Sequence, residues 1–172
     1  MSKKKVLITY ATYGSGHKTV ANYLANYLIN QSDYEVKVID LMDYENLIGL
    51  ISKKVFEQNF KFRTSSAIFS VLYELFDFKT TTLPYKAATK AIFKNKALQE
   101  EIISFNPDLL ISTHFFGNIT LGMLNRKKLT NTKIISIITD YKSHEMWEKE
   151  VKSIDALIVS NDIVKNDLIT KG

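Results

Sequence analysis

Five short apolar runs recur along the chain, and most of them are separated by helix-like patterns. They span residues 6–10, 36–39, 109–112, 134–138 and 156–159. The runs are rich in β-branched residues and end at polar or turn residues, which is typical of strands buried on both faces of a sheet. The pattern therefore predicts an α/β fold with a doubly wound, mostly parallel sheet.

The first helix is predicted directly after a glycine turn. Behind Gly16, apolar residues recur with the spacing of one helical face, at Val20, Leu24, Tyr27 and Leu28. Strand, glycine turn, helix and strand together form a βαβ unit.

Three further helices follow from the same reasoning. One is predicted to begin near Pro84, because proline suits a first helical turn, and to end before Asn106-Pro107. A second follows the turn at residues 113–117 and runs to about Leu129, and a last one runs towards Lys171.

The composition is that of one folded domain. The chain has 172 residues, is 45% hydrophobic, and holds only two prolines and six glycines. The absence of cysteine excludes a disulfide framework, a thiolate metal site and a cysteine nucleophile. A net charge of +5 fits either anionic partners or plain solubility. No run approaches the roughly 20 apolar residues of a membrane span.

Polar residues follow the carboxyl ends of several predicted strands. The glycine turn, Asp40, His114, Asp140 and Asn161 each stand just past a strand. Because ligands of parallel sheets lie beyond these strand ends, the sequence predicts that the polar residues converge on one edge.

The turn Gly14-Ser15-Gly16-His17 is the first candidate site. Glycines allow close backbone approach, and the amino end of the following helix favours an anion. The turn matches neither the G-x-G-x-x-G fingerprint nor a P-loop. It is either an anion-binding turn with His17 as a candidate base or a plain tight turn.

Two further groups carry possible chemistry. Thr113-His114 follows one strand, and Thr139-Asp140, with His144 downstream, follows another. Three histidines and an aspartate raise the question of zinc, but their spacings match no metal motif, so we predict neither a metal nor a cofactor.

Residues 44–79 interleave aromatic and basic side chains. Such a pattern fits an interfacial helix, base stacking or a plain core, and for the whole segment we favour partial exposure at a membrane. The residues concerned include Phe56, Phe60, Phe62, Phe69, Tyr73, Phe76, Phe78, Lys53, Lys54, Lys61 and Arg63.

Three segments, "GSGHKT", "PDLLISTHF" and "ITDYKSHEMW", occur in order at the predicted strand ends. Together they resemble the amino-terminal domain of the bacterial diacylglycerol glucosyltransferases and the plant monogalactosyldiacylglycerol synthases, which have the GT-B fold. The resemblance runs from Lys4 to Gly172.

The resemblance implies that residues 1–172 form a Rossmann-like, acceptor-binding half, with the donor domain expected after residue 172. The parent enzyme is expected to move glucose or galactose from a UDP-sugar to diacylglycerol with inversion. It is expected to act as a peripheral protein at the cytoplasmic face of the membrane, with an anionic lipid surface as partner and without nucleic acid.

Residue by residue, the histidines of the family map to His17 and His114, and Asp140 is a third candidate for the base. The residues expected to hold the acceptor or phosphate are Gly14, Ser15, Gly16, Thr139 and His144. Those expected at the membrane are Lys53, Lys54, Phe60, Lys61, Arg63 and, by the resemblance, Trp147.

The chain departs from the family pattern at three positions. Ser15 interrupts three glycines, Lys18 replaces an arginine, and Phe115 stands where proline is common. The third change bears on the acceptor groove and leaves the exact acceptor open. Two alternatives remain: a flavodoxin-like module that binds FMN phosphate, and a membrane-binding module without catalysis.

Overall fold

Strands and helices alternate along the chain. The computed structural model describes residues 2–12, 15–44, 94–141, 147 and 151–171. The elements are β1 (Lys4–Tyr10), α1 (Ser15–Ile29), β2 (Tyr34–Asp40), the 3-10 helix η1 (Leu41–Tyr44), α5 (Lys96–Phe105), β3 (Leu109–Ser112), α6 (Phe115–Arg126), β4 (Lys133–Ile138), the 3-10 helix η2 (Val151–Ser153), β5 (Ala156–Val159) and α8 (Asp162–Lys171).

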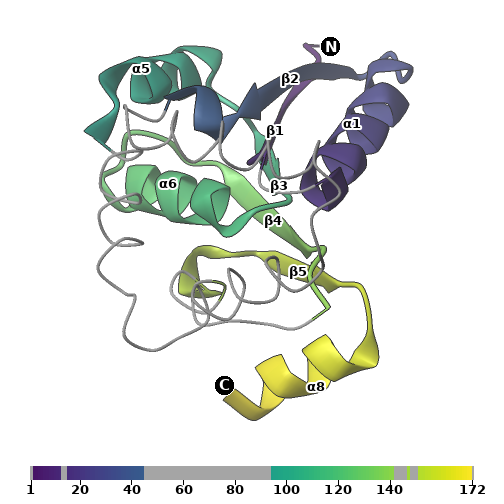
Figure 1. Cartoon of the computed structure of the whole chain (residues 1–172). Helices are drawn as coiled ribbons and strands as arrows, with labels where there is room; N and C mark the ends of the chain where they lie inside the picture. Colours follow the sequence, from purple (N-terminus) through teal and green to yellow (C-terminus); the bar gives the residue numbers. More distant parts are fainter. Residues whose placement is uncertain (1, 13–14, 45–93, 142–146, 148–150, 172) are drawn as a thin grey trace, which may run out of the picture.

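The strands form a single parallel sheet in the order β2-β1-β3-β4-β5 (Figure 1). β1 lies in the interior, with Val6 aligned with Val36 of β2 on one side and with Leu109 of β3 on the other. The predicted doubly wound α/β fold is therefore confirmed. In this strand order the topological switch point lies between β1 and β3.

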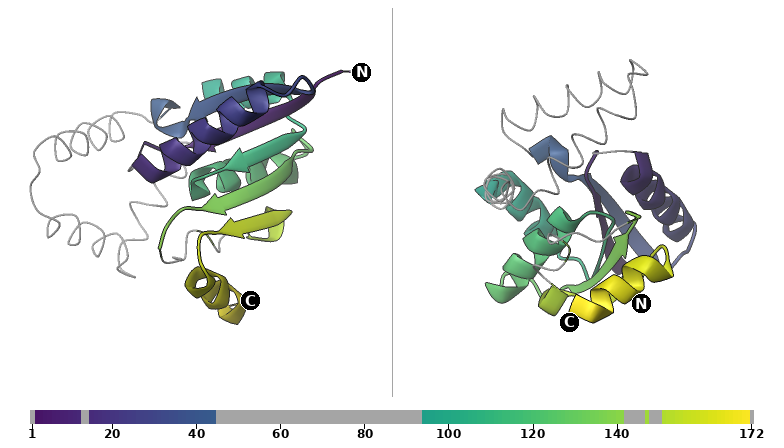
Figure 2. Two further views of the ribbon diagram at one scale, coloured as in Figure 1. Left: turned by 90° about the vertical axis from the view of Figure 1, so that its right-hand side faces the viewer. Right: turned by 60° about the horizontal axis from the view of Figure 1, so that its bottom comes forward.

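Helices cover both faces of the sheet (Figure 2). Val6 and Ile8 of β1 belong to the apolar cluster beneath α1, whereas Leu7 belongs to the larger cluster beneath α5 and α6. All three side chains are at most 1% exposed. A strand covered on both faces must be apolar at successive positions, which explains the unbroken run in the sequence.

α5 ends where the predicted helix ends, and an N-cap inside the predicted range sets its start. The helix begins at Lys96, because Asn95 takes an extended conformation and its side chain accepts a hydrogen bond from the backbone N–H of Leu98. It ends before Asn106, whose left-handed φ of 50° closes the last turn. The proposed start near Pro84 lies outside the described residues.

α6 is also shorter than predicted. It ends at Arg126 rather than near Leu129. Lys128 adopts a left-handed φ of 58°, which is incompatible with continued α-helix and turns the chain towards β4.

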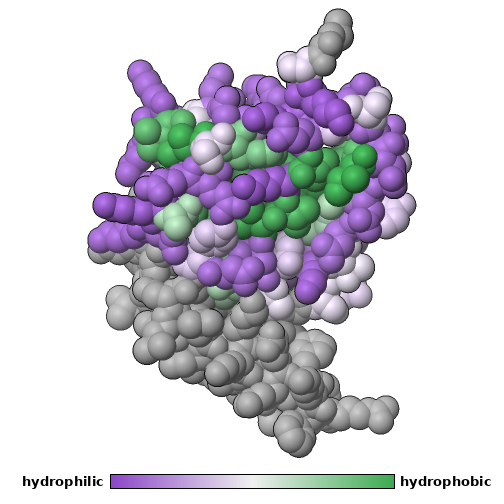
Figure 3. All heavy atoms as spheres, turned by 90° about the horizontal axis from the view of Figure 1, so that it is seen from above, coloured by the Kyte–Doolittle hydropathy of each residue, from purple (hydrophilic) through white to green (hydrophobic). Residues whose placement is uncertain are grey.

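β2 forms one edge of the sheet and carries both charged and apolar side chains. Val38 is 37% exposed, and Glu35 and Lys37 flank the apolar positions. Figure 3 looks onto this side of the molecule and shows apolar side chains in a band bordered by polar ones. Charged residues on an edge strand oppose pairing with a second sheet.

Candidate active site

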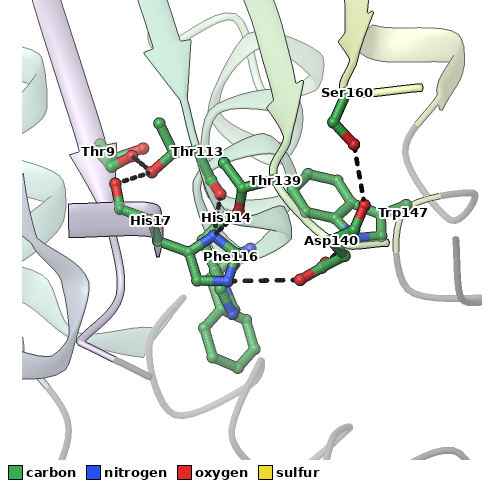
Figure 4. Close-up of polar contacts among 9 residues, drawn as sticks. All are labelled: Thr9, His17, Thr113, His114, Phe116, Thr139, Asp140, Trp147 and Ser160. Carbon is green, nitrogen blue, oxygen red and sulfur yellow. Dashed lines mark hydrogen bonds and ion pairs between the residues drawn. The ribbon is translucent and has the colours of Figure 1, made fainter. Parts of the chain in front are cut away.

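The carboxyl ends of β1, β3 and β4 meet at the switch point of the sheet. The chain leaves β1 into α1 and leaves β3 into α6 (Figure 1). His17, Thr113, His114, Thr139 and Asp140 come together here, although they are far apart in the sequence (Figure 4). Of the residues predicted to converge at this edge, His17 of the glycine turn, His114 and Asp140 lie together. The other two have hydrogen bonds elsewhere: Asp40 accepts from Thr12 and Met42, and Asn161 accepts from Val164 at the start of α8.

His17 is the third residue of α1 and is only 8% exposed. Its Nδ1 atom lies 2.5 Å from the carbonyl oxygen of Thr113 and 2.8 Å from the hydroxyl oxygen of Thr139. The imidazole is therefore held by residues that follow two different strands, which fixes the direction of its opposite nitrogen, Nε2.

Thr113 also ties the backbone of these elements together. Its hydroxyl donates to the carbonyl oxygen of His17 at 3.0 Å, and its backbone N–H donates to the carbonyl oxygen of Thr9 at 3.0 Å. The end of β3 is in this way joined to the end of β1 and to the first turn of α1. Several hydrogen bonds therefore fix the position of His17 relative to the sheet.

Asp140 faces the other side of the His17 ring. Its Oδ1 atom lies 3.8 Å from His17 Nε2, which is ion-pair range but too long for a hydrogen bond. Oδ2 accepts a 2.9 Å hydrogen bond from the indole N–H of Trp147, and the backbone carbonyl of Asp140 accepts one from Ser160 (Figure 4). The side chain of Asp140 remains 23% exposed.

His114 is the N-cap of α6. It has extended φ and ψ of −142° and 140°, and its Nδ1 accepts a 3.4 Å hydrogen bond from the backbone N–H of Phe116. Its ring lies edge-on to that of His17, with 4.9 Å between the centroids. The ring is 5% exposed and packs against Phe115.

Trp147 does not lie at the surface, where the resemblance had led us to expect it. The side chain is 1% exposed, and its ring contacts those of Phe115 and His114 within the main apolar cluster. A tryptophan buried in this way cannot insert into a bilayer without leaving the core. It also contacts the site through the hydrogen bond that its indole N–H donates to Asp140.

The glycine turn is described only in part. Ser15 and Gly16 are exposed at the start of α1. A Cβ atom on Gly16 would lie 3.9 Å from Thr139 Oγ1, an ordinary contact, so packing alone does not require glycine there. Gly14, His144, Lys53, Lys54, Phe60, Lys61 and Arg63 lie outside the described residues. None of the helices among the described residues has both the length and the apolar character to cross a membrane.

Asp40 has a structural task that sequence reasoning did not assign. One carboxylate oxygen accepts from the backbone N–H groups of Thr12 and Met42, at 3.3 and 3.0 Å, and the other from the hydroxyl of Thr12. The carboxylate thus fixes the loop after β1 and the turn after β2. The signal in the sequence that could have indicated this task is the place of Asp40 directly after a predicted strand.

The described part of the chain holds no group of three or more His, Asp or Glu side chains placed to bind a metal ion. The chemistry available to these residues is that of histidine, carboxylate and hydroxyl groups at the amino end of a helix. Such a set can accept a proton and stabilise a nearby charge.

The chain is similar to proteins of one known family. Residues 17–172 match the family of monogalactosyldiacylglycerol (MGDG) synthases. The chain is 29% identical over 174 residues to a processive diacylglycerol beta-glucosyltransferase of Bacillus pumilus (strain SAFR-032), and 27% identical to the protein of that name from Bacillus subtilis (strain 168). Each alignment covers 99% of this chain and 43% of the relative.

A relative of the same name from Staphylococcus carnosus (strain TM300) is 27% identical over 147 residues. No solved structure matches the chain significantly. The chain spans less than half the length of these curated relatives. Since the family match covers most of the chain, including His17, His114 and Asp140, the chain belongs to the MGDG synthase family.

Proposed function

We propose that the chain is the acceptor-binding half of an inverting glycosyltransferase that moves a hexose from a UDP-sugar to the free hydroxyl of diacylglycerol. The observation that carries this proposal is His17, held through Nδ1 with Nε2 turned towards Asp140 at the switch point. The names of the relatives favour glucose as the sugar, and that of the family favours galactose.

In the proposed reaction, His17 acts as the general base. The hydroxyl oxygen of the lipid attacks the anomeric carbon while Nε2 takes its proton. The bond from that carbon to the diphosphate oxygen breaks, and UDP leaves with the electron pair. Attack from the face opposite the leaving group inverts the anomeric configuration. A positioned base of this kind accelerates a reaction by about 10²–10⁴-fold.

The surroundings of His17 support the charges that this step creates. The carboxylate of Asp140, 3.8 Å from Nε2, stabilises the imidazolium that forms when the proton arrives. The hydrogen bond from Trp147 keeps the carboxylate in place. The amino end of α1, where Ser15 and Gly16 are exposed, offers a positive dipole end for the departing diphosphate.

The remaining half of the longer protein supplies the UDP-sugar site in this proposal. The acceptor lipid lies in a bilayer, so the chain is proposed to dock as a peripheral protein on the anionic cytoplasmic face, without nucleic acid as a partner. Lys53, Lys54, Lys61 and Arg63, with Phe60, are the residues proposed for this contact.

The catalytic proposal is tested with the longer protein that carries this chain and its donor half. Transfer from UDP-glucose and UDP-galactose to diacylglycerol in vesicles is followed by mass spectrometry. His17→Asn keeps a donor for the Thr113 carbonyl but lacks Nε2, so kcat should fall about 10²–10⁴-fold. Asn22→Ala, on the exposed side of α1, is the matched control. Near-normal turnover of His17→Asn would reject His17 as the base.

The membrane proposal has its own test. Changing Lys53, Lys54, Lys61 and Arg63 to glutamine should weaken sedimentation with phosphatidylglycerol vesicles, since each basic residue near such a surface contributes about 1 kcal/mol. Salt should weaken the wild-type binding as well. Equal binding before and after the fourfold change would place the contact on another surface.

The strand order alone also fits an FMN-binding module, because β2-β1-β3-β4-β5 is the order of flavodoxin. Fold does not determine function, and two measurements in solution distinguish FMN binding from sugar transfer. A flavodoxin-like module would quench FMN fluorescence on titration and would transfer no sugar when joined to the donor half. A membrane-binding module without catalysis would bind vesicles and likewise transfer no sugar.

A further inference from the structure

We propose that His17 and His114 hold opposite neutral tautomers, with the proton of His17 on Nδ1 and that of His114 on Nε2. The two rings are neighbours, with centroids 4.9 Å apart, but their Nδ1 atoms have opposite kinds of backbone partner. The site would then contain one histidine that accepts a proton at Nε2 and one that already carries a proton there.

The partner of His17 requires a hydrogen on Nδ1. The carbonyl oxygen of Thr113, 2.5 Å away, has lone pairs and no hydrogen, so it can only accept. A bare Nδ1 at this distance would point its own lone pair at that oxygen, which is repulsive. In the neutral ring, Nε2 is consequently the unprotonated nitrogen.

Thr139 is the second residue that positions the His17 ring. Its hydroxyl oxygen lies 2.8 Å from Nδ1. Because the N–H is needed by the Thr113 carbonyl, the hydroxyl acts as a further acceptor of the same hydrogen, and its own hydrogen points elsewhere. Thr139 therefore restrains the ring, while the carbonyl of Thr113 sets the tautomer.

The hydrogen-bond partner of His114 requires an Nδ1 without a hydrogen. The backbone N–H of Phe116 donates to Nδ1 of His114, which must present a lone pair. This bond is part of the cap of α6 and satisfies one of the amide groups that a helix leaves unpaired at its start. In the neutral ring the proton is then on Nε2.

The two tautomers separate the roles of the histidines. Within the described part of the chain, His17 Nε2 has no hydrogen-bond partner, and its nearest ionic neighbour is Asp140 at 3.8 Å. A proton from a substrate hydroxyl can be received there. His114 cannot receive one at Nε2 in its capping tautomer, so its task is to hold α6 and to line the site. The division of roles between the two histidines rests on the proposed function, whereas the assignment of the tautomers does not depend on it.

The test is the long-range ¹H–¹⁵N spectrum of the 172-residue chain with labelled histidine at pH 8, above the ordinary histidine pKa of about 6.5. The chain has three histidines, so the spectrum is simple. The variants His17→Asn, His114→Asn and His144→Gln assign the signals, and asparagine at position 114 keeps an N-cap. Through-bond correlation to the assigned backbone replaces any variant that does not fold.

The expected result is a protonated Nδ1 and a bare Nε2 for His17, and the reverse for His114. Thr139→Val should leave the His17 pattern unchanged, with Thr139→Ser as the control. The same tautomer in both rings, a doubly protonated ring, averaged signals, or a His17 proton that moves to Nε2 in Thr139→Val would overturn the proposal. If the tautomers are as expected but His17→Asn of the longer protein keeps normal turnover, only the proposed function fails.

Discussion

At the scale of single residues, Gly117 sets how closely α6 can lie on the sheet. A Cβ atom at this position would lie 2.2 Å from both Ser112 Oγ and Thr9 Oγ1, far inside contact distance. These two hydroxyls hydrogen-bond to each other at 3.1 Å beneath the helix. Any side chain at position 117 must push the helix or the hydroxyl pair away.

Gly117→Ala should therefore destabilise the fold, although alanine is the better helix former by about 1 kcal/mol. Overpacking of this kind costs about 1–3 kcal/mol, and urea unfolding should show the loss. Gly16→Ala is the matched control, because its Cβ would make only an ordinary 3.9 Å contact. Equal stability of both variants would show that α6 adjusts freely.

Asp40 is the second residue with a large expected effect. Asp40→Ala leaves the backbone N–H groups of Thr12 and Met42 without their acceptor, which should lower the free energy of unfolding by about 1–3 kcal/mol. Asp33→Ala, at an exposed position, should change it by less than about 0.5 kcal/mol. Thermal unfolding of both variants compares them directly, and similar melting temperatures would contradict this assignment.

At the scale of elements, Asn95 joins the start of α5 to the end of η1. Its Oδ1 atom accepts from Leu98 N, and its Nδ2 donates to the carbonyl oxygen of Tyr44 at 2.7 Å. The bond to Tyr44 joins two segments that lie on either side of residues 45–93 in the sequence. One side chain thus caps α5 and links it to η1.

The two tasks of Asn95 can be separated by substitution. Asn95→Ala should cost about 0.5–2 kcal/mol for the cap and about 1 kcal/mol more for the bond to Tyr44. Asn95→Asp keeps a capping oxygen but cannot donate to the carbonyl, so its stability should fall between those of wild type and Asn95→Ala. Urea unfolding of the three proteins gives the order, and a loss in Asn95→Asp as large as in Asn95→Ala would contradict it.

A second contact of α5, with β2 and η1, depends on pH. The Glu101 carboxylate pairs with Lys37 at 2.8 Å and accepts a hydrogen bond from the hydroxyl of Tyr44. The hydrogen bond from Lys37, and then that from Tyr44, lowers the pKa of Glu101 below its ordinary value of 4.5. Burial, followed by the bond to Glu101, raises the pKa of Tyr44 to about 12, so its phenol remains a donor at neutral pH.

The pH dependence follows from the direction of the shift. A depressed carboxyl pKa contributes stability that is complete above 4.5 and is lost as the pH falls through the lower value of the folded state. The difference in free energy of unfolding between wild type and Glu101→Gln should therefore be largest near neutral pH and shrink below about pH 4.5. Urea unfolding from pH 7 to pH 3 measures it, and a constant difference would contradict the ion pair.

At the scale of the whole molecule, the sheet could be predicted because its inner strands β1 and β3 are buried on both faces and are apolar at successive positions. Residues 109–112 and 156–159 were predicted with the bounds that β3 and β5 have. The N-cap at Asn95 was not predicted, because asparagine is common both at helix starts and in loops. Its second bond, to Tyr44 51 positions away, leaves no local signal.

The side chains of the site could also be predicted in part. Parallel strands bring the residues behind them to one edge, which is why His17, His114 and Asp140 could be named together. The hydrogen bond between His17 Nδ1 and the backbone carbonyl of Thr113 could not be predicted, because every residue has a backbone carbonyl and the sequence does not show which one is the partner. Trp147 was expected at a membrane surface by the resemblance alone, whereas its side chain is buried.

The strand order has a consequence for how the chain folds. β1 and β2 close over a short stretch of chain, whereas Thr9 and Ser112, in the neighbouring strands β1 and β3, are 103 positions apart. Closing the longer loop costs more conformational entropy, and distant contacts form more slowly. In refolding followed by pulsed hydrogen exchange, amides of the β1–β2 pair should become protected before that of Thr113. The contact between His17 and Thr139, 122 positions away, needs β4 in place, so we expect the hydrogen bonds of His17 to be completed late in folding.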